Sequence, residues 1–332
     1  MCIARFSLLC MKQKSVMDVG YSHHVKAAFV FDAANGICAA FIMKTLVAPV
    51  ERVRHLQRSI PEISKVSAFR VAASVVQELG VSSLWKSTGS YSLRYSPLQG
   101  LNFAFKDLFR RTWAHHRNEH RSSLPPWDRN VVCGATAGMT SLLFMYPSER
   151  YYRALARAAK GTANHAVSEY SSLLDFCRRT VHKGGFRLLY RGFCMAAVNV
   201  AVYRGLYFGA YDSIAPLMHR EPQTLSSFLI GSFLLGWTVA STAGLVSYPF
   251  ITVRHRTVGA SNPQNSNVNN RLSIMAHVRC ASDILRTEGP KALFRGGRSA
   301  LTLRSITGGG VLAIYDSLHH PYLFDFLFRS FV

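Results

Sequence analysis

Cationic side chains interrupt the long apolar segments of this chain, where burying a charge costs free energy. They are Lys44, Arg94, Lys106, Arg204 and Arg304. An ionisable residue inside such a segment is functional by default, and arginine forks match phosphate oxygens. The cluster has no matching acids, so it predicts a site for an anion with several negative charges. Extension of the side chain toward lipid headgroups is the alternative, and it fits Lys106 and Arg110 best because both lie near a segment end.

Three of the apolar segments end in a proline followed by charged residues: APVERVR (48–54), YPSERYYR (146–153) and YPFITVRHR (248–256). A proline removes one backbone donor and kinks a helix, so three such helices would converge at one mouth of a bundle. An acid and a base beyond each kink would then form ion pairs that close this mouth. Only the first copy holds both charges. The positions of this gate are Glu51, Arg54, Glu149, Tyr152, Ile251 and Arg254.

The composition limits the class of protein that could carry these residues. The 332 residues are 49% hydrophobic and 17% charged, with 39 Lys+Arg against 17 Asp+Glu and a formal net charge of +22. This charge suits a nucleic-acid binder, a membrane-surface protein or a membrane protein with basic loops. The basic residues punctuate long apolar segments, which favours the third class, and we expect no nucleic-acid partner.

Motifs for catalysis or for metal binding are not found in the sequence. Seven cysteines form no C-x-x-C pair, so we expect reduced thiols and neither a disulfide scaffold nor a metal site. The phosphate-loop, H-E-x-x-H and G-x-S-x-G motifs are absent as well. We therefore expect no catalytic residues and no enzyme activity.

Three sets of markers recur along the chain about every hundred residues. The prolines of the gate motifs lie at 49, 147 and 249, and aromatic-basic pairs begin at 85, 190 and 294. Aspartates lie at 107, 212 and 316, so they share with the aromatic-basic pairs the spacings of 105 and then 104 positions. The chain is therefore predicted to contain three copies of a unit of about one hundred residues.

Each unit predicts an apolar segment long enough to span a membrane, a short amphipathic helix and a second span. The spans are expected at 28–53, 88–112, 129–152, 194–217, 229–254 and 299–319, and the short helices near 67–78, 172–183 and 276–287. The predicted fold is an all-α membrane protein with six transmembrane helices in three pseudo-symmetric repeats. Its divisions are an irregular leader (1–25), the repeats (26–120, 121–222 and 223–320) and a tail (321–332).

The distribution of basic residues predicts which way the spans face. The connections 54–88, 150–194 and 254–300 hold 22 lysines and arginines, whereas 111–129 and 218–224 hold only five. By the positive-inside bias, the three basic connections share one side of the membrane and both termini lie on the other.

The gate motif resembles the signature of the mitochondrial carriers, Pro-x-[Asp/Glu]-x-x-[Lys/Arg], and four longer segments are most similar to the ADP/ATP carriers. These segments are KTLVAPVERVR (44–54), RYSPLQGLNFAFKD (94–107), YRGLYFGAYD (203–212) and AGLVSYPFITVR (243–254). The arginine-methionine hallmark of that group is replaced here by RHRTVG (254–259). The resemblance implies a monomeric antiporter of the mitochondrial inner membrane that exchanges ADP and ATP by alternating access, with both termini toward the intermembrane space.

The resemblance also assigns roles to individual positions. Phosphate contacts would be Lys44, Arg94 and Arg304, and the remaining substrate positions Asn199, Val200, Tyr203, Ser247, Asn102 and Arg204. The gate described above would face the matrix, each acid pairing with the base of the next unit. A second, cytoplasmic gate would comprise Asp107, Arg110, Asp212, Asp316 and His319, with Ala215 in one basic position. Anionic lipid, expected to be cardiolipin, would bind at Arg191, Gly192, Arg295 and Gly296, and no other cofactor is expected.

Two other functions remain open from the sequence. In the first alternative, the chain carries another phosphorylated anion. The altered hallmark and the Asn199-Val200 pair favour this function. In the second it is a membrane protein of this fold that no longer transports. Incomplete gates at both mouths favour the second, but the retained cations Lys44, Arg94 and Arg304 argue against it, because a scaffold has no use for buried cations.

Overall fold

The computed structural model describes residues 2–60, 63, 66–86, 88–117, 126–158, 172–190, 192–218, 225–259, 274–294 and 297–319. Among these residues every regular element is a helix. The six long helices are α1 (Cys2–Ser59), α3 (Thr88–Arg117), α4 (Pro126–Ala158), α6 (Phe193–Met218), α7 (Leu225–Gly259) and α10 (Gly297–His319). The all-α fold with six long helices in three repeats is therefore confirmed.

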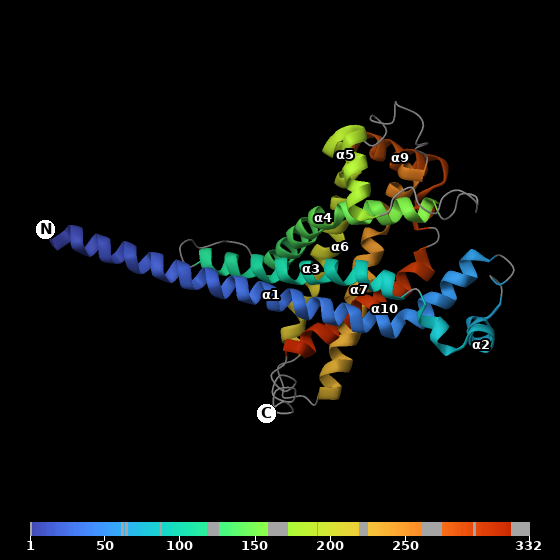
Figure 1. Cartoon of the computed structure of the whole chain (residues 1–332), viewed down its shortest axis with the longest axis horizontal. Helices are drawn as coiled ribbons and strands as arrows, with labels where there is room; N and C mark the ends of the chain where they lie inside the picture. The colour runs from blue at the N-terminus through green and yellow to red at the C-terminus, as the bar shows by residue number, and fades with distance from the viewer. Residues whose placement is uncertain are drawn as a thin grey trace.

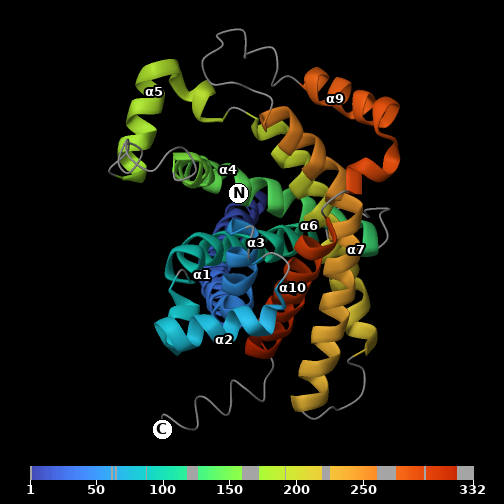
Figure 2. The same cartoon turned by 90° about the vertical axis from the view of Figure 1, so that its right-hand side faces the viewer.

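The long helices pack in a closed ring. The two long helices of each repeat contact one another, α3 contacts α4, α6 contacts α7, and α10 returns to α1 (Figure 2). In the first repeat the backbones approach closely, because a Cβ atom on Gly36 would lie 2.9 Å from the Cα of Gly100. Gly236 and Gly309 make an equivalent approach in the third repeat. Small residues at these crossings allow the tight packing that membrane helices use.

In the described part of the chain, four helices are long and apolar enough to cross a membrane: α1, α4, α6 and α7. Large apolar side chains cover their outward faces, including Val30, Leu46, Phe144 and Ile230, each at least 60% exposed. Such faces suit contact with lipid. α3 (30 residues) and α10 (23 residues) complete the ring, and neither belongs to the four apolar helices. The proline of each gate motif lies within a continuous helix.

Three short helices lie outside the ring, as Figure 2 shows: α2 (Ala68–Leu79), α5 (Leu173–Leu189) and α9 (Ile274–Thr287). All three were predicted near these bounds. Gly80, Gly185 and Gly289 follow their helical stretches, and each has a positive φ between 71° and 79°. Glycine adopts this left-handed conformation without the steric cost of a Cβ atom. The three glycines thus end the same helix in each repeat, and α5 is broken at Gly185. Two 3₁₀ turns, η2 (Val81–Trp85) and η3 (Pro290–Phe294), follow α2 and α9.

The leader expected to lack regular structure is helical, which corrects that prediction. α1 begins at Cys2 and extends well beyond the rest of the bundle before it joins the ring (Figure 1). The first proline of the chain is Pro49, so a single glycine, Gly20, is the one residue of low helix propensity that interrupts the leader without stopping the helix.

Aromatic side chains fill the centre of the bundle where α3, α6 and α10 meet. The ring of Phe103 stacks on Tyr315 with centroids 3.9 Å apart and meets Phe208 edge-on at 5.2 Å. All three side chains are buried. This packing fixes the relative register of the three helices that carry the repeated aspartates.

Candidate functional site

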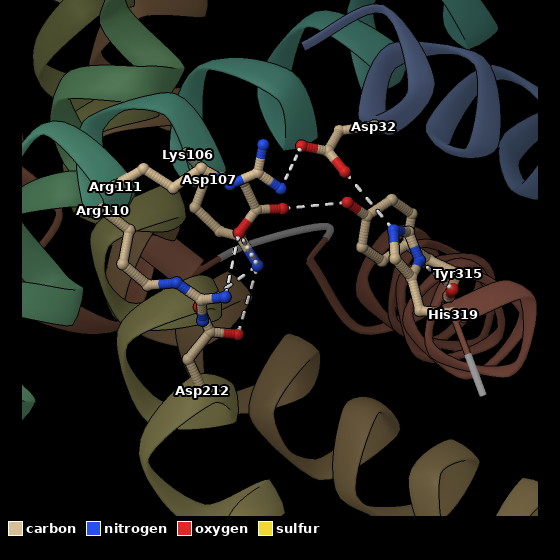
Figure 3. A network of polar contacts seen from close by, with 8 residues as sticks. All are labelled: Asp32, Lys106, Asp107, Arg110, Arg111, Asp212, Tyr315 and His319. Atoms are coloured by element: carbon tan, nitrogen blue, oxygen red, sulfur yellow. Dashed lines mark hydrogen bonds and ion pairs between the residues drawn. The ribbon is translucent and has the colours of Figure 1, made fainter. Parts of the chain in front are cut away.

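The repeated aspartates Asp107, Asp212 and Asp316 mark one end of the bundle, called here the aspartate end. Lys106 Nζ lies 3.1 Å from Asp212 Oδ2 and 3.6 Å from Asp107 Oδ1, so it joins α3 to α6 (Figure 3). The Lys106 side chain is only 7% exposed. The interpretation of Lys106 as a side chain reaching for lipid headgroups is therefore wrong, because two carboxylates hold its ammonium group inside the bundle.

Tyrosines connect α10 to the other two helices at this end. The Tyr315 hydroxyl donates to Asp107 Oδ2 at 2.9 Å, and the Tyr211 hydroxyl donates to Asp316 Oδ2 at 2.6 Å. Arg110 lies farther out, 3.4 Å from Asp107 and 3.8 Å from Asp212, with its side chain 48% exposed. Polar contacts therefore link all three repeats, although Ala215 supplies no base. The aspartate end is closed.

His319 belongs to the same network through a residue that the sequence analysis missed. Its Nε2 lies 3.3 Å from Asp32 Oδ1, and Arg111 Nη2 lies 2.9 Å from the other oxygen of Asp32 (Figure 3). Asp32 is 2% exposed and comes from α1. It therefore joins the first helix to α3 and to α10. An acid inside an apolar span was the signal available in the sequence, the same one that identified the cations.

The opposite end contains the gate prolines and is called here the proline end. Its expected ion pairs between helices do not form in this structure. Glu149 pairs with Arg153, one turn away on the same helix, and not with Arg254. Arg254 lies within hydrogen-bonding reach of the Tyr146 side chain. Among the described residues, these contacts leave the proline end without the ring of charges that would close it.

The first gate motif is also engaged elsewhere. Glu51 pairs with Lys44 of the same helix, and no hydrogen bond joins Glu51 to Tyr152 in the part of the chain that the structure describes. Arg54 Nη1 donates to Thr302 Oγ1 of α10 at 3.2 Å. Ile251 is half-buried and has no polar group to offer Arg54. A hydrogen bond from Tyr152 to Glu51, which the sequence allowed, does not form among the described residues, and Arg54, which was expected to find no partner at Ile251, donates to α10.

Aromatic rings contact the cations predicted to bind phosphate. Lys44 Nζ lies 4.8 Å from the centre of the Tyr95 ring, and the Arg94 guanidinium lies 5.4 Å from the centre of the Tyr152 ring. Such cation–π contacts hold a cation in place without neutralising its charge. Arg304 is exposed and makes no hydrogen bond or ion pair with the residues that the structure describes.

Arg204 is the buried member of this group, at 8% exposure. Its guanidinium donates to Gln99 Oε1 and lies 5.5 Å and 5.3 Å from the ring centres of Tyr203 and Tyr207. The absence of a side chain on Gly138 leaves room for the Arg204 stem, since a Cβ atom there would lie 2.7 Å from Arg204 Cγ. The hydrogen-bond partner of Arg204 is therefore a neutral amide and not a carboxylate.

Further hydrogen bonds extend along α3 from Gln99, the residue that accepts from Arg204. Gln99 Nε2 donates to the Tyr95 hydroxyl at 2.8 Å, and Asn102 Nδ2 donates to the Leu98 carbonyl at 2.6 Å. Tyr95 also lies in electrostatic range of Arg204, Tyr203 and Glu51. The structure thus brings predicted substrate residues of α1, α3 and α6 around Tyr95, which the sequence analysis did not single out.

The remaining predicted substrate positions differ in their surroundings. Ser247 is fully buried and donates to the Gly244 carbonyl of its own helix at 3.2 Å. Asn199 and Val200 are half-buried. Oxygen Oδ1 of Asn199 and of Asn102 is buried without a hydrogen-bond partner among the described residues. Both amides therefore have an acceptor oxygen without a protein partner in the described chain, whereas the Ser247 hydroxyl hydrogen is used within its own helix.

Of the predicted lipid positions, Gly192 has a φ of 78° at the start of α6. Arg191, Arg295 and Gly296 lie outside the described residues. Lipid binding stays a prediction.

Comparison with known proteins adds to this geometry. The family model described as mitochondrial carrier protein matches residues 26–117, 123–222 and 226–325. The ADP,ATP carrier protein of Schizosaccharomyces pombe is 35% identical over 304 residues, which are 88% of this chain and 90% of that protein. The ADP/ATP translocase of Thermothelomyces thermophilus is 36% identical over 302 residues, 87% of this chain and 91% of that protein. An ADP,ATP carrier protein of Solanum tuberosum is 36% identical over 301 residues, 88% of this chain and 75% of that protein.

Proposed function

Since the chain belongs to the mitochondrial carrier family, we propose that it is an antiporter of the mitochondrial inner membrane that exchanges ADP and ATP. The relatives named above support a nucleotide as cargo. The observation that carries the proposal is the set of cations gathered around Tyr95 and Tyr203. Lys44 and Arg204 lie against these rings, and Arg304 is in electrostatic range of Tyr203. Cations can bind the phosphates while an aromatic ring stacks on the base.

The two ends of the bundle support alternating access. A network of ion pairs and hydrogen bonds closes the aspartate end, while the gate charges of the proline end pair within their own helices or with other partners. We assign this conformation to the state open toward the matrix. In the opposite state, the proline end would close and the aspartate network would break. The incomplete charge set at the proline end lowers the stability of that second state relative to a complete ring.

The proposal also includes a topology and a lipid environment. Both termini face the intermembrane space, and the three basic connections with α2, α5 and α9 face the matrix. Cardiolipin binds where the basic loops meet the starts of α6 and α10, around Gly192 and Gly296, because helix N-termini and basic side chains attract phosphate.

Competition for uptake identifies the cargo. Purified protein in liposomes loaded with ADP should take up labelled ADP, and external ADP and ATP should compete most strongly among nucleotides and phosphorylated metabolites. Adenosine should not compete, because it has no phosphate for the cations. Stronger competition by guanine nucleotides or by a phosphorylated anion without a base would contradict adenine selection and favour another cargo, consistent with the Asn199-Val200 pair.

A further inference from the structure

The ion pair between Glu51 and Lys44 places a gate acid against a cation of the predicted phosphate site. The two residues are seven positions apart on α1, which corresponds to two helical turns and about 10.5 Å of rise. Both side chains therefore project from one face of the helix, and both are long enough to meet. Their exposed fractions are 13% and 26%, so water screens the pair only partly.

The neighbouring residues explain why Glu51 turns toward the site. Position 152, where the resemblance predicts a basic partner, holds a tyrosine whose ring lies under Arg94. The equivalent acid of the second repeat, Glu149, has a base one turn away in Arg153 and pairs with it. Arg54 lies one turn beyond Glu51 but donates to Thr302 of α10, and Glu51 pairs with Lys44.

We propose that Glu51 sets how much negative charge the substrate site accepts, an inference that rests on the proposed function. A phosphate that reaches Lys44 competes with the Glu51 carboxylate for the ammonium group. The carboxylate also repels every negative charge on the substrate. ATP carries one negative charge more than ADP, so the carboxylate disfavours ATP more strongly. Glu51 is thus a specificity-determining residue. When substrate binds at Lys44, the Glu51 carboxylate is released and can turn toward the proline end.

Binding of inorganic anions tests this role without a base or a transport step. The full chain is purified in detergent without magnesium, and thermal stabilisation is titrated with phosphate, pyrophosphate and tripolyphosphate. Glu51→Gln should lower the Kd for each anion, and the gain should rise with anion charge to about threefold to tenfold for tripolyphosphate. In liposomes the same variant should lower the KM for ATP relative to the KM for ADP by about threefold.

Two further variants separate this effect from a change in net charge or in folding. Glu288 accepts from Arg256 Nη2 at 2.8 Å in a partly exposed pair after α9, so Glu288→Gln removes the same charge away from the site. It should leave every Kd unchanged. Glu51→Asp keeps the charge but shortens the reach to Lys44, so the Kd for each anion should fall by less than in Glu51→Gln. This variant also tests the proposal if Glu51→Gln does not fold.

The outcomes are distinct. An equal gain for all three anions, no gain in either Glu51 variant, or an equal gain in Glu288→Gln overturns the proposal. If the unaltered protein binds the anions as described but exchanges no nucleotide, the proposed function fails and the role of Glu51 stands. If nucleotides exchange normally and Glu51→Gln leaves the ratio of KM values unchanged, the role of Glu51 fails alone.

Discussion

Replacing Lys106 with methionine should destabilise the protein by about 3–5 kcal/mol and abolish nucleotide exchange, because two buried carboxylates would lose the buried cation between them and keep only the half-exposed Arg110. Lys106 is 5% exposed, and its ammonium lies 3.1 Å from Asp212. Methionine fills a similar volume, so the loss of stability would come from the missing charge and not from a cavity. Thermal unfolding in detergent and uptake in liposomes measure the two effects.

Arg110 provides the matched control at the same end. Its side chain is 48% exposed and lies 3.4 Å from Asp107 and 3.8 Å from Asp212. Arg110→Met should therefore cost only about 1 kcal/mol or less. Asp212→Asn in the Lys106→Met background should restore part of the stability, since it removes one uncompensated charge. Equal costs for the two single variants would mean that Lys106 is not the centre of the network.

Arg94→Ala should reduce nucleotide exchange roughly a hundredfold while leaving the unfolding temperature nearly unchanged. Arg94 is half-buried and rests on the Tyr152 ring, so the substitution would remove the proposed phosphate contact together with a weak cation–π contact. Uptake and thermal unfolding of the same preparation separate these contributions.

Two comparison variants sharpen this result. Arg94→Lys keeps the charge without the planar fork, so exchange should recover only in part. Arg179 pairs with Asp175 at 2.8 Å on the exposed surface of α5, and Arg179→Ala should transport normally. Normal transport by Arg94→Ala would show that the phosphate site is misplaced.

Most of the fold could be predicted from the sequence because its signals are local or periodic. The common spacing of the three sets of markers gave the repeats, and the amphipathic pattern placed α2, α5 and α9 within a few residues. Positive φ values at Gly80, Gly185 and Gly289 explain why glycine marks the same point in each repeat. The helical leader was missed because a basic segment with only a short apolar run was taken for an irregular leader.

The members of the site were easier to predict than their partners. The aspartates and central cations follow from residue type and period, but Lys106 bridging two aspartates, or Tyr315 donating to Asp107, depends on the register between helices. Asp32 was missed because the search within spans considered only cations. Lys44 and Glu51 were assigned to separate sites, although their spacing on one helix face allows the pair that the structure contains.

Counter-exchange in liposomes decides whether this chain exchanges phosphorylated nucleotides. Purified protein is placed in two sets of liposomes, one loaded with ADP and one empty, and uptake of labelled ADP is followed. We predict uptake into the loaded liposomes and none into the empty ones, because an antiporter returns its binding site only when substrate occupies it from the other side. Equal uptake into both sets, or no uptake into either of them, would contradict the account.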